Sequence, residues 1–217
     1  MEGGDDEDLE MDQLPPEAQQ AVREMLASAM EQSDQPDDSP IAQILAAAER
    51  GDLAEFSSLL DAHAMDVNEQ GDEGDTALHI SCLYGHIEIA QECVRRGASV
   101  LACDEDGSTP LHDAFSRLVR SYDLVKFLLQ SGARVDAVDN DGDTPLHLAS
   151  NGSHSHVCEL LLTHAAPEQA ARMKGLKNEM GQTAAALADD LALSRKLQLE
   201  DEDSLDGVGS ELKKSRK

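Results

Sequence analysis

Residues 142–166 read GDTPLHLASNGSHSHVCELLLTHAA, and two related stretches lie upstream of them. Residues 107–135 read GSTPLHDAFSRLVRSYDLVKFLLQSGARV, and residues 74–100 read GDTALHISCLYGHIEIAQECVRRGASV. The threonines of the three stretches, Thr76, Thr109 and Thr144, lie 33 and 35 residues apart. Self-similarity at a period near 33 residues indicates a repeat protein built from helix–turn–helix units.

Each unit carries the signals of two short helices. A threonine followed in two units by proline is typical of a helix start, and apolar residues such as Val125, Leu128 and Leu129 recur at helical spacing in the second helix. One helix pair alone cannot hide its apolar face from water. Stacking against neighbours buries that face, so we expect a continuous solenoid with polar capping units at both ends.

Degenerate copies of the unit flank the three clear ones. Residues 44–68 keep the spacing of both helices, with Ser39 and Pro40 as a helix start and Ala42 in the position of the threonine. Downstream, residues 181–190 read GQTAAALADD, and a short helix is expected over 191–199. The two extra residues of the middle unit fall in the 117–121 turn, where a longer connection is tolerated.

The motifs TALH, TPLH and TPLH in register resemble the ankyrin-repeat family over residues 39–199. The resemblance implies an all-α solenoid of stacked helix–turn–helix units with short β-hairpin loops. We expect a capping repeat at 39–71, repeats at 72–104, 105–139 and 140–178, and a partial repeat at 179–199. The family is known for binding other proteins, so we expect no enzyme.

The two ends differ in composition from the middle. Residues 1–38 and 200–217 are rich in acidic and small polar residues, which favours disordered tails. Within the first tail, residues 14–31 place apolar side chains along one helical face. This amphipathic helix could dock on the solenoid or bind a partner.

The formal net charge of −27 restricts the partners. Such a chain repels nucleic acid and anionic membranes and attracts basic proteins. The four cysteines lack metal-like spacing and no apolar run is long enough for a membrane span, so we expect a cytoplasmic protein. We also expect a monomer. The basic end at 213–217 leaves a nuclear location open.

Histidines are the first candidates for chemistry. The resemblance implies that His79, His112 and His147 bond the repeat threonines and backbone groups, which makes Thr76, Thr109, Thr144 and these histidines structural. The cluster of His154, His156, Cys158 and His164 does not offer four convergent ligands in a tetrahedral site. We therefore expect no catalytic residues, no metal and no cofactor.

The resemblance implies that the loops before each repeat threonine form fingers lining a concave face. These loops are acidic here, so they either select a basic partner or keep the solenoid soluble. The first helix of each repeat should add groove residues, with Tyr84 as an anchor. The predicted partner-binding residues are Asp72, Glu73, Asp75, Ile80, Leu83, Tyr84, Asp104, Glu105, Asp106, Asp113, Arg117, Asp139, Asp141, Asp143 and Asn151.

Three functions fit this pattern. The first is an adaptor or scaffold that binds a basic protein through the acidic concave face. The second is a dedicated chaperone of a basic nucleic-acid-binding protein such as a ribosomal protein, and the third is a regulatory subunit of an enzyme or transcription factor. The long connection at 166–181 carries Arg172, Lys174 and Lys177 and could form an extra helix from Pro167 that folds back on an acidic tail.

Overall fold

The computed structural model describes residues 15, 19–20, 39–115, 122–152 and 154–198. The chain divides into two compact units, Met1–Asp38 and Ser39–Lys217. In the first unit, the described Gln19 and Gln20 are helical, and the Gln19 N–H donates to the Pro15 carbonyl at 3.0 Å. The rest of the helix predicted at 14–31, the predicted tail at 200–217 and the predicted insertion at 117–121 lie outside the described residues.

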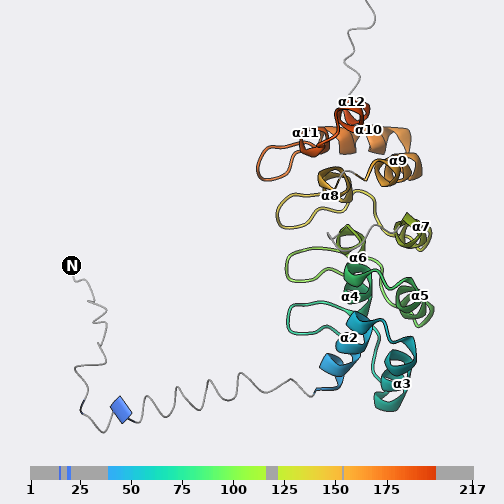
Figure 1. The fold of residues 1–217 in the computed structure, drawn as a ribbon, viewed down its shortest axis with the longest axis vertical. Helices are drawn as coiled ribbons and strands as arrows, with labels where there is room; N and C mark the ends of the chain where they lie inside the picture. The colour runs from blue at the N-terminus through green and yellow to red at the C-terminus, as the bar shows by residue number, and fades with distance from the viewer. Residues whose placement is uncertain (1–14, 16–18, 21–38, 116–121, 153, 199–217) are drawn as a thin grey trace, which may run out of the picture. The chain divides into compact units, whose positions relative to one another are not determined.

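The second unit is a stack of helix pairs. Figure 1 shows the first helices of the pairs as one column, the second helices as a neighbouring column, and the intervening loops projecting away from the second column. The architecture is the predicted all-α ankyrin solenoid. Its helices are α2 (Pro40–Arg50), α3 (Leu53–His63), α4 (Ala77–Tyr84), α5 (Ile87–Arg95), α6 (Pro110–Asp113), α7 (Tyr122–Gln130), α8 (Pro145–Asn151), α9 (Ser155–His164), α10 (Pro167–Gly175), α11 (Ala184–Leu187) and α12 (Leu191–Leu197).

Local signals in the sequence explain where the first pair begins and turns. The Ser39 hydroxyl accepts a hydrogen bond from the Ala42 N–H at 3.2 Å, and Pro40 occupies the first turn of α2. Gly51 ends the helix with a φ of 76°, a conformation that glycine adopts without steric cost. The Asp52 carboxylate then accepts from the Glu55 N–H at 2.9 Å and starts α3. The degenerate first repeat therefore keeps complete helix caps.

The core runs between the two columns of helices. Its side chains are mostly Leu, Ala, Ile, Val and Cys, and the repeat positions of Leu78, Leu111 and Leu146 are each 0% exposed. Leu193 and Leu197 of α12 are also buried, although α11 and α12 are short. Burying a leucine side chain contributes about 2 kcal/mol. Stacking of successive pairs thus supplies the apolar burial that one pair lacks.

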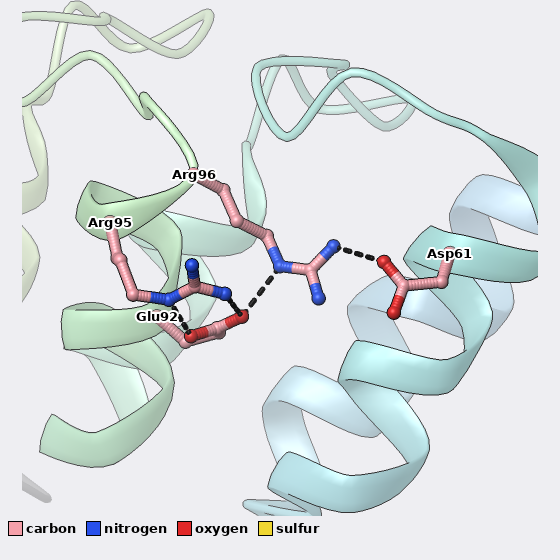
Figure 2. Close-up of polar contacts among 4 residues, drawn as sticks. All are labelled: Asp61, Glu92, Arg95 and Arg96. Carbon is pink, nitrogen blue, oxygen red and sulfur yellow. Dashed lines mark hydrogen bonds and ion pairs between the residues drawn. The ribbon is translucent and has the colours of Figure 1, made fainter.

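A network of ion pairs joins the first two repeats on the side of the second helices (Figure 2). The Arg96 guanidinium donates to Asp61 of α3 at 2.6 Å and to Glu92 of α5 at 2.6 Å. Arg95 donates to both oxygens of the Glu92 carboxylate, at 2.7 Å to Oε2 and at 2.6 Å to Oε1, the oxygen that also accepts from Arg96. These hydrogen bonds lower the pKa of Glu92 to about 2. Arg96 therefore ties α3 to α5 across the repeat boundary.

The extra helix expected from Pro167 is α10. It is anchored by Met173, which is 0% exposed. Its basic Arg172 donates to the Asp136 carboxylate at 2.5 Å, and Asp136 also pairs with Arg134 at 3.4 Å. Arg172 is thus bound to the preceding repeat. The predicted contact of the 166–181 connection with an acidic tail involves residues outside the described part of the chain.

Candidate functional site

Four turns of the same geometry stand between the helix pairs, at residues 71–75, 104–108, 139–143 and 178–182, and they are called the fingers below. In each finger the first residue donates its N–H to the carbonyl of the fifth. The distances are 2.9 Å for Gly71 to Asp75, 3.1 Å for Asp104 to Ser108, 3.1 Å for Asp139 to Asp143 and 3.0 Å for Asn178 to Gln182. The fourth residue is always glycine with a φ between 73° and 77°.

Glycine is needed at this position for two reasons. The positive φ is strained for residues with a Cβ atom. In addition, a Cβ on Gly74 would lie 2.9 Å from the Glu105 backbone nitrogen of the next finger, and one on Gly142 would lie 2.9 Å from that of Glu179. The sequence therefore permits successive fingers to approach each other closely.

Backbone hydrogen bonds join each finger to the next. The N–H of Glu105 donates to the Glu73 carbonyl at 3.2 Å, that of Asn140 to Asp106 at 2.9 Å, and that of Glu179 to Asp141 at 2.9 Å. Side-chain amides reinforce this ladder: Gln70 donates to the Gly74 and Cys103 carbonyls, Asn140 to Glu105, and Asn178 to the Asp143 carboxylate. The fingers thus form one continuous hydrogen-bonded structure.

The predicted acidic residues divide into two groups within the fingers. Asp72, Glu73, Glu105, Asp106 and Asp141 are exposed at the tips, as is Glu179 of the fourth finger. The other four, Asp75, Asp104, Asp139 and Asp143, are half-buried at the bases.

The base carboxylates also hold the turns. Asp104 accepts from the Ser108 N–H at 2.8 Å, and Asp139 accepts from the N–H groups of Asp141 at 3.0 Å and Asp143 at 2.8 Å. Burial raises the pKa of Asp139, and burial together with the charges of Asp104, Glu73 and Asp106 raises the pKa of Asp75 to about 6. Only the tip carboxylates are thus presented fully to solvent.

The repeat threonines and histidines lie beneath the fingers and form capping boxes. The threonine hydroxyl lies 2.8 to 2.9 Å from the histidine Nδ1, and the threonine N–H donates to the same nitrogen at 3.0 to 3.2 Å. An accepting Nδ1 assigns the neutral tautomer with its proton on Nε2. The Nε2 of His147 lies 3.2 Å from the carbonyls of Leu176 and Gln182 in the next finger segment.

The other two histidines differ from His147 in one respect: the Nε2 atoms of His79 and His112 are buried without a hydrogen-bond partner among the described residues. Burial lowers the pKa of His79 and of His112, so both are neutral at pH 7. The backbone of Ser108 and Ala102 raises the pKa of His79 by a smaller amount than burial lowers it. The backbone of Ala137 and Asp143 has the same effect on the pKa of His112. These buried rings bond the threonine that begins each first helix, and they are part of the helix caps.

A pocket of about 240 Å³ opens between the fingers and the first helices. Its apolar wall consists of Leu83, Phe115 and Leu148, and its polar wall includes Ser108, Asp113 and Asp139. The Oδ2 atom of Asp113 is buried without a hydrogen-bond partner among the described residues. Burial, together with the charges of Asp75 and Asp104, raises the pKa of Asp113 to about 8.

The remaining predicted groove residues are less closely associated with this pocket. Ile80 is half-buried, Asn151 is exposed at the end of α8, and Tyr84 is 37% exposed. The Tyr84 hydroxyl bonds Glu49 of α2, which raises the tyrosine pKa. Arg117 lies outside the described residues.

Phe115 and Ser108 line the pocket although the sequence patterns singled out neither, and Phe115 is the larger of the two. It stands six residues after Thr109, where the neighbouring repeats carry the small Cys82 and Ser150. A large aromatic side chain at a position that is otherwise small was the available signal. Phe115 is 8% exposed, so it forms a wall of the pocket and not a protruding anchor.

A second pocket, of about 530 Å³, lies on the second helices, away from the fingers. It is lined by Tyr122 of α7 and by residues of α9 that include His156 and Glu159. Glu159 is already paired with Lys196 of α12. In the described part of the chain, no group of three or more potential ligands could hold a metal ion, and no helix is long and apolar enough to cross a membrane.

Comparisons with known proteins agree with the geometry of the repeats. Residues 44–139 match the family described as ankyrin repeats in three copies, and residues 120–162 match ankyrin repeats in many copies. The Notch-regulated ankyrin repeat-containing protein of Homo sapiens is 37% identical over 71 residues, which are 31% of this chain and 62% of that protein.

Two longer proteins share only a segment with the chain. The serine/threonine-protein kinase TNNI3K of Mus musculus is 36% identical over 74 residues, which are 33% of this chain and 9% of the kinase. The SMC5-SMC6 complex localization factor protein 1 of Homo sapiens is 40% identical over 73 residues, which are 33% of this chain and 7% of that protein. The chain therefore spans less than a tenth of the kinase, and the similarity does not extend over its length.

Proposed function

The chain belongs to the ankyrin-repeat family, whose repeats act in protein–protein interaction, and on this premise we propose that it is an adaptor or scaffold for a basic partner protein. The binding surface is the concave face, and its principal contacts are the exposed carboxylates of the finger tips. Ankyrin repeats are typically non-catalytic interaction modules, so the protein acts by holding its partner.

One observation carries this proposal: a rigid row of carboxylates without a basic residue among them. The four fingers contain no Lys or Arg, while the tips expose Asp72, Glu73, Glu105, Asp106 and Asp141. The ladder from Glu73 to Glu179 fixes the order of the tips. A fixed row of like charges creates a local negative potential that attracts a complementary basic surface.

Solubility alone would require no such arrangement. Flexible acidic residues anywhere on the surface raise the net charge equally well, whereas the fingers are held by three inter-finger backbone hydrogen bonds and by side-chain amides. A preorganised surface loses less conformational entropy when a partner binds. The fixed geometry therefore favours a recognition role over a purely solubilising one.

Capture from cell extract on the full chain tests the proposal. We expect the wild-type protein to retain one basic protein at about 0.1 M salt and to release most of it at about 1 M, because the Debye length falls from about 10 Å to about 3 Å. The Glu73→Lys, Glu105→Lys double variant should retain at most about a tenth as much, as measured by quantitative mass spectrometry.

A matched control carries the same change in charge elsewhere. Glu88 of α5 and Asp123 of α7 are exposed on the second helices, so the Glu88→Lys, Asp123→Lys variant alters the net charge equally without touching the fingers. Retention should remain near the wild-type level in this control. Equal losses in the two double variants would show that only net charge matters and would contradict the proposal.

The identity of the retained protein then separates the alternative functions. A ribosomal or other nucleic-acid-binding protein that loses its nucleic acid on capture would support the dedicated chaperone. An enzyme or transcription factor whose activity changes on binding would support the regulatory subunit. Both alternatives use the same acidic fingers, so the variants above test their common premise.

A further inference from the structure

The pocket beside Asp113 combines features that the exposed finger tips lack. Leu83 of α4 and Leu148 of α8 approach it from the two neighbouring repeats, and Phe115 adds an aromatic ring. Asp113 contributes a carboxylate whose Oδ2 is buried and has no hydrogen-bond partner among the described residues. An unpaired buried carboxylate is unfavourable, so a cation held at the pocket wall that Asp113 helps to form lowers the free-energy cost of ionising it.

The size and composition of the pocket restrict that ligand. A volume of about 240 Å³ is below the roughly 300–1,000 Å³ typical of small-molecule sites. The described residues offer no group of three metal ligands. A single long side chain with an apolar stem and a cationic end fits the apolar wall and the carboxylate together.

Arginine matches these features better than lysine. Its guanidinium is more weakly hydrated than an ammonium group, so it loses less on entering a half-buried site. The planar group can donate to a carboxylate through two N–H groups and can also lie against an aromatic ring such as that of Phe115. Lysine presents a compact and strongly hydrated charge instead.

We propose that this pocket receives one arginine side chain of the partner protein, which makes Asp113 the specific anchor beneath the acidic fingers. The inference rests on the proposed function, because it identifies the side chain through which a basic partner is recognised. The finger carboxylates attract and orient the partner, and the Asp113 pocket selects an arginine in it.

The electrostatic surroundings of Asp113 give the binding a measurable proton linkage. Asp75 and Asp104 face it from two fingers, while Asp139 and the neutral ring of His112 line the same pocket. With a pKa near 8, Asp113 is mostly protonated at pH 7. A bound guanidinium favours the ionised carboxylate, so binding releases up to about one proton and strengthens as the pH rises through 8.

Nuclear magnetic resonance on the isotope-labelled full chain tests the pocket without a known partner. The probe is N-acetyl-arginine amide, and its neutral control is N-acetyl-citrulline amide. We expect the arginine probe to shift the backbone signals of Leu83, Phe115 and Leu148, with affinity at least about tenfold above that of citrulline. The carboxyl carbon of Asp113 should titrate at least about one pH unit lower with saturating arginine probe.

Two variants test the pocket. Asp113→Asn removes the anchor carboxyl and should abolish the shifts, while Glu88→Gln removes a charge from the exposed face of α5, away from the fingers and the pocket, and should leave them in place. Equal binding of citrulline, or an unchanged response in Asp113→Asn, would overturn the arginine pocket.

A second probe tests the proposed function, the binding of a basic partner by the fingers, independently of the pocket. A hexalysine peptide should shift the finger signals of wild-type protein at low salt whether or not the pocket takes arginine. Finger shifts with hexalysine but no pocket shifts with the arginine probe would leave the acidic docking face intact and refute only the pocket. The absence of both responses would refute the proposed function as well.

Discussion

Replacing Asp113 by asparagine should stabilise the folded protein at neutral pH. The folded state holds the carboxyl at a pKa of about 8, whereas its ordinary value is 3.8. When folding raises the pKa of an acid, the free energy of unfolding is highest below the ordinary pKa. It then falls progressively as the pH rises to the pKa of the folded state. The destabilisation by Asp113 therefore grows between about pH 4 and pH 8 and is complete above pH 8, whereas asparagine does not titrate.

The magnitude follows from the difference between the pH and the unfolded pKa. At pH 7 that difference is about three units from 3.8, so keeping Asp113 protonated costs at most about 4 kcal/mol. Solvent reaches part of the side chain and the new amide also needs hydrogen bonds, so we expect a net gain of roughly 1–3 kcal/mol. At pH 4.5 the expected gain falls below about 1 kcal/mol.

Urea denaturation of wild-type and Asp113→Asn protein at pH 4.5, 7 and 8.5 measures this gain. Taking the difference between the two proteins at each pH cancels the titration of all other groups. Glu105→Gln at an exposed finger tip is the control and should change the free energy of unfolding by no more than about 0.5 kcal/mol at any of these pH values. A gain that does not vary with pH, or a variant less stable than wild type at pH 8.5, would refute the buried-charge reasoning.

Three further predictions concern the solenoid itself. His147→Ala removes the imidazole that links α8 to the next finger segment and should lower the free energy of unfolding in urea by about 2–4 kcal/mol. Glu92→Gln breaks the pair with Arg96 and should lower the free energy of unfolding by about 1 kcal/mol at pH 7, where Glu92 is ionised. The effect should be smaller in urea denaturation at pH 3 and absent below the lowered pKa of about 2, because the carboxyl is then protonated in the folded protein. N-ethylmaleimide should label exposed Cys103 in the native protein but modify Cys82, whose thiol pKa is raised by burial, only after unfolding, as peptide mass spectrometry can determine.

The fold could be predicted from the sequence because its determining interactions are local. A threonine and a histidine three residues apart form the capping box within one turn, and the same spacing recurs in three repeats. The glycine of each finger likewise fulfils a local backbone requirement. Repetition of such local signals at one period leaves a single way to stack the helices.

The candidate site was less predictable because burial depends on contacts between repeats. The sequence places Asp75, Glu105 and Asp113 in one acidic set, but it does not distinguish a tip from a base or a pocket. That distinction arises where one finger packs against the next, through bonds such as the one from the Glu105 N–H to the Glu73 carbonyl. Similarly, the pairing of Arg172 with Asp136 joins residues that are far apart in the chain, and residue spacing gives no sign of it.

The electrostatics of the concave face connect stability to function. Both ring nitrogens of the buried His147 have hydrogen-bond partners, whereas Asp75 and Asp113 have pKa values raised by burial and by like charges. Neutral residues at these two positions would make a more stable solenoid. Ionisation of these two carboxyls is unfavourable, and a cation from a partner bound at this face would make it less so. The Asp113→Asn variant should therefore be more stable than wild type and bind arginine less well, and a loss of both stability and binding would indicate a structural role for this carboxylate instead.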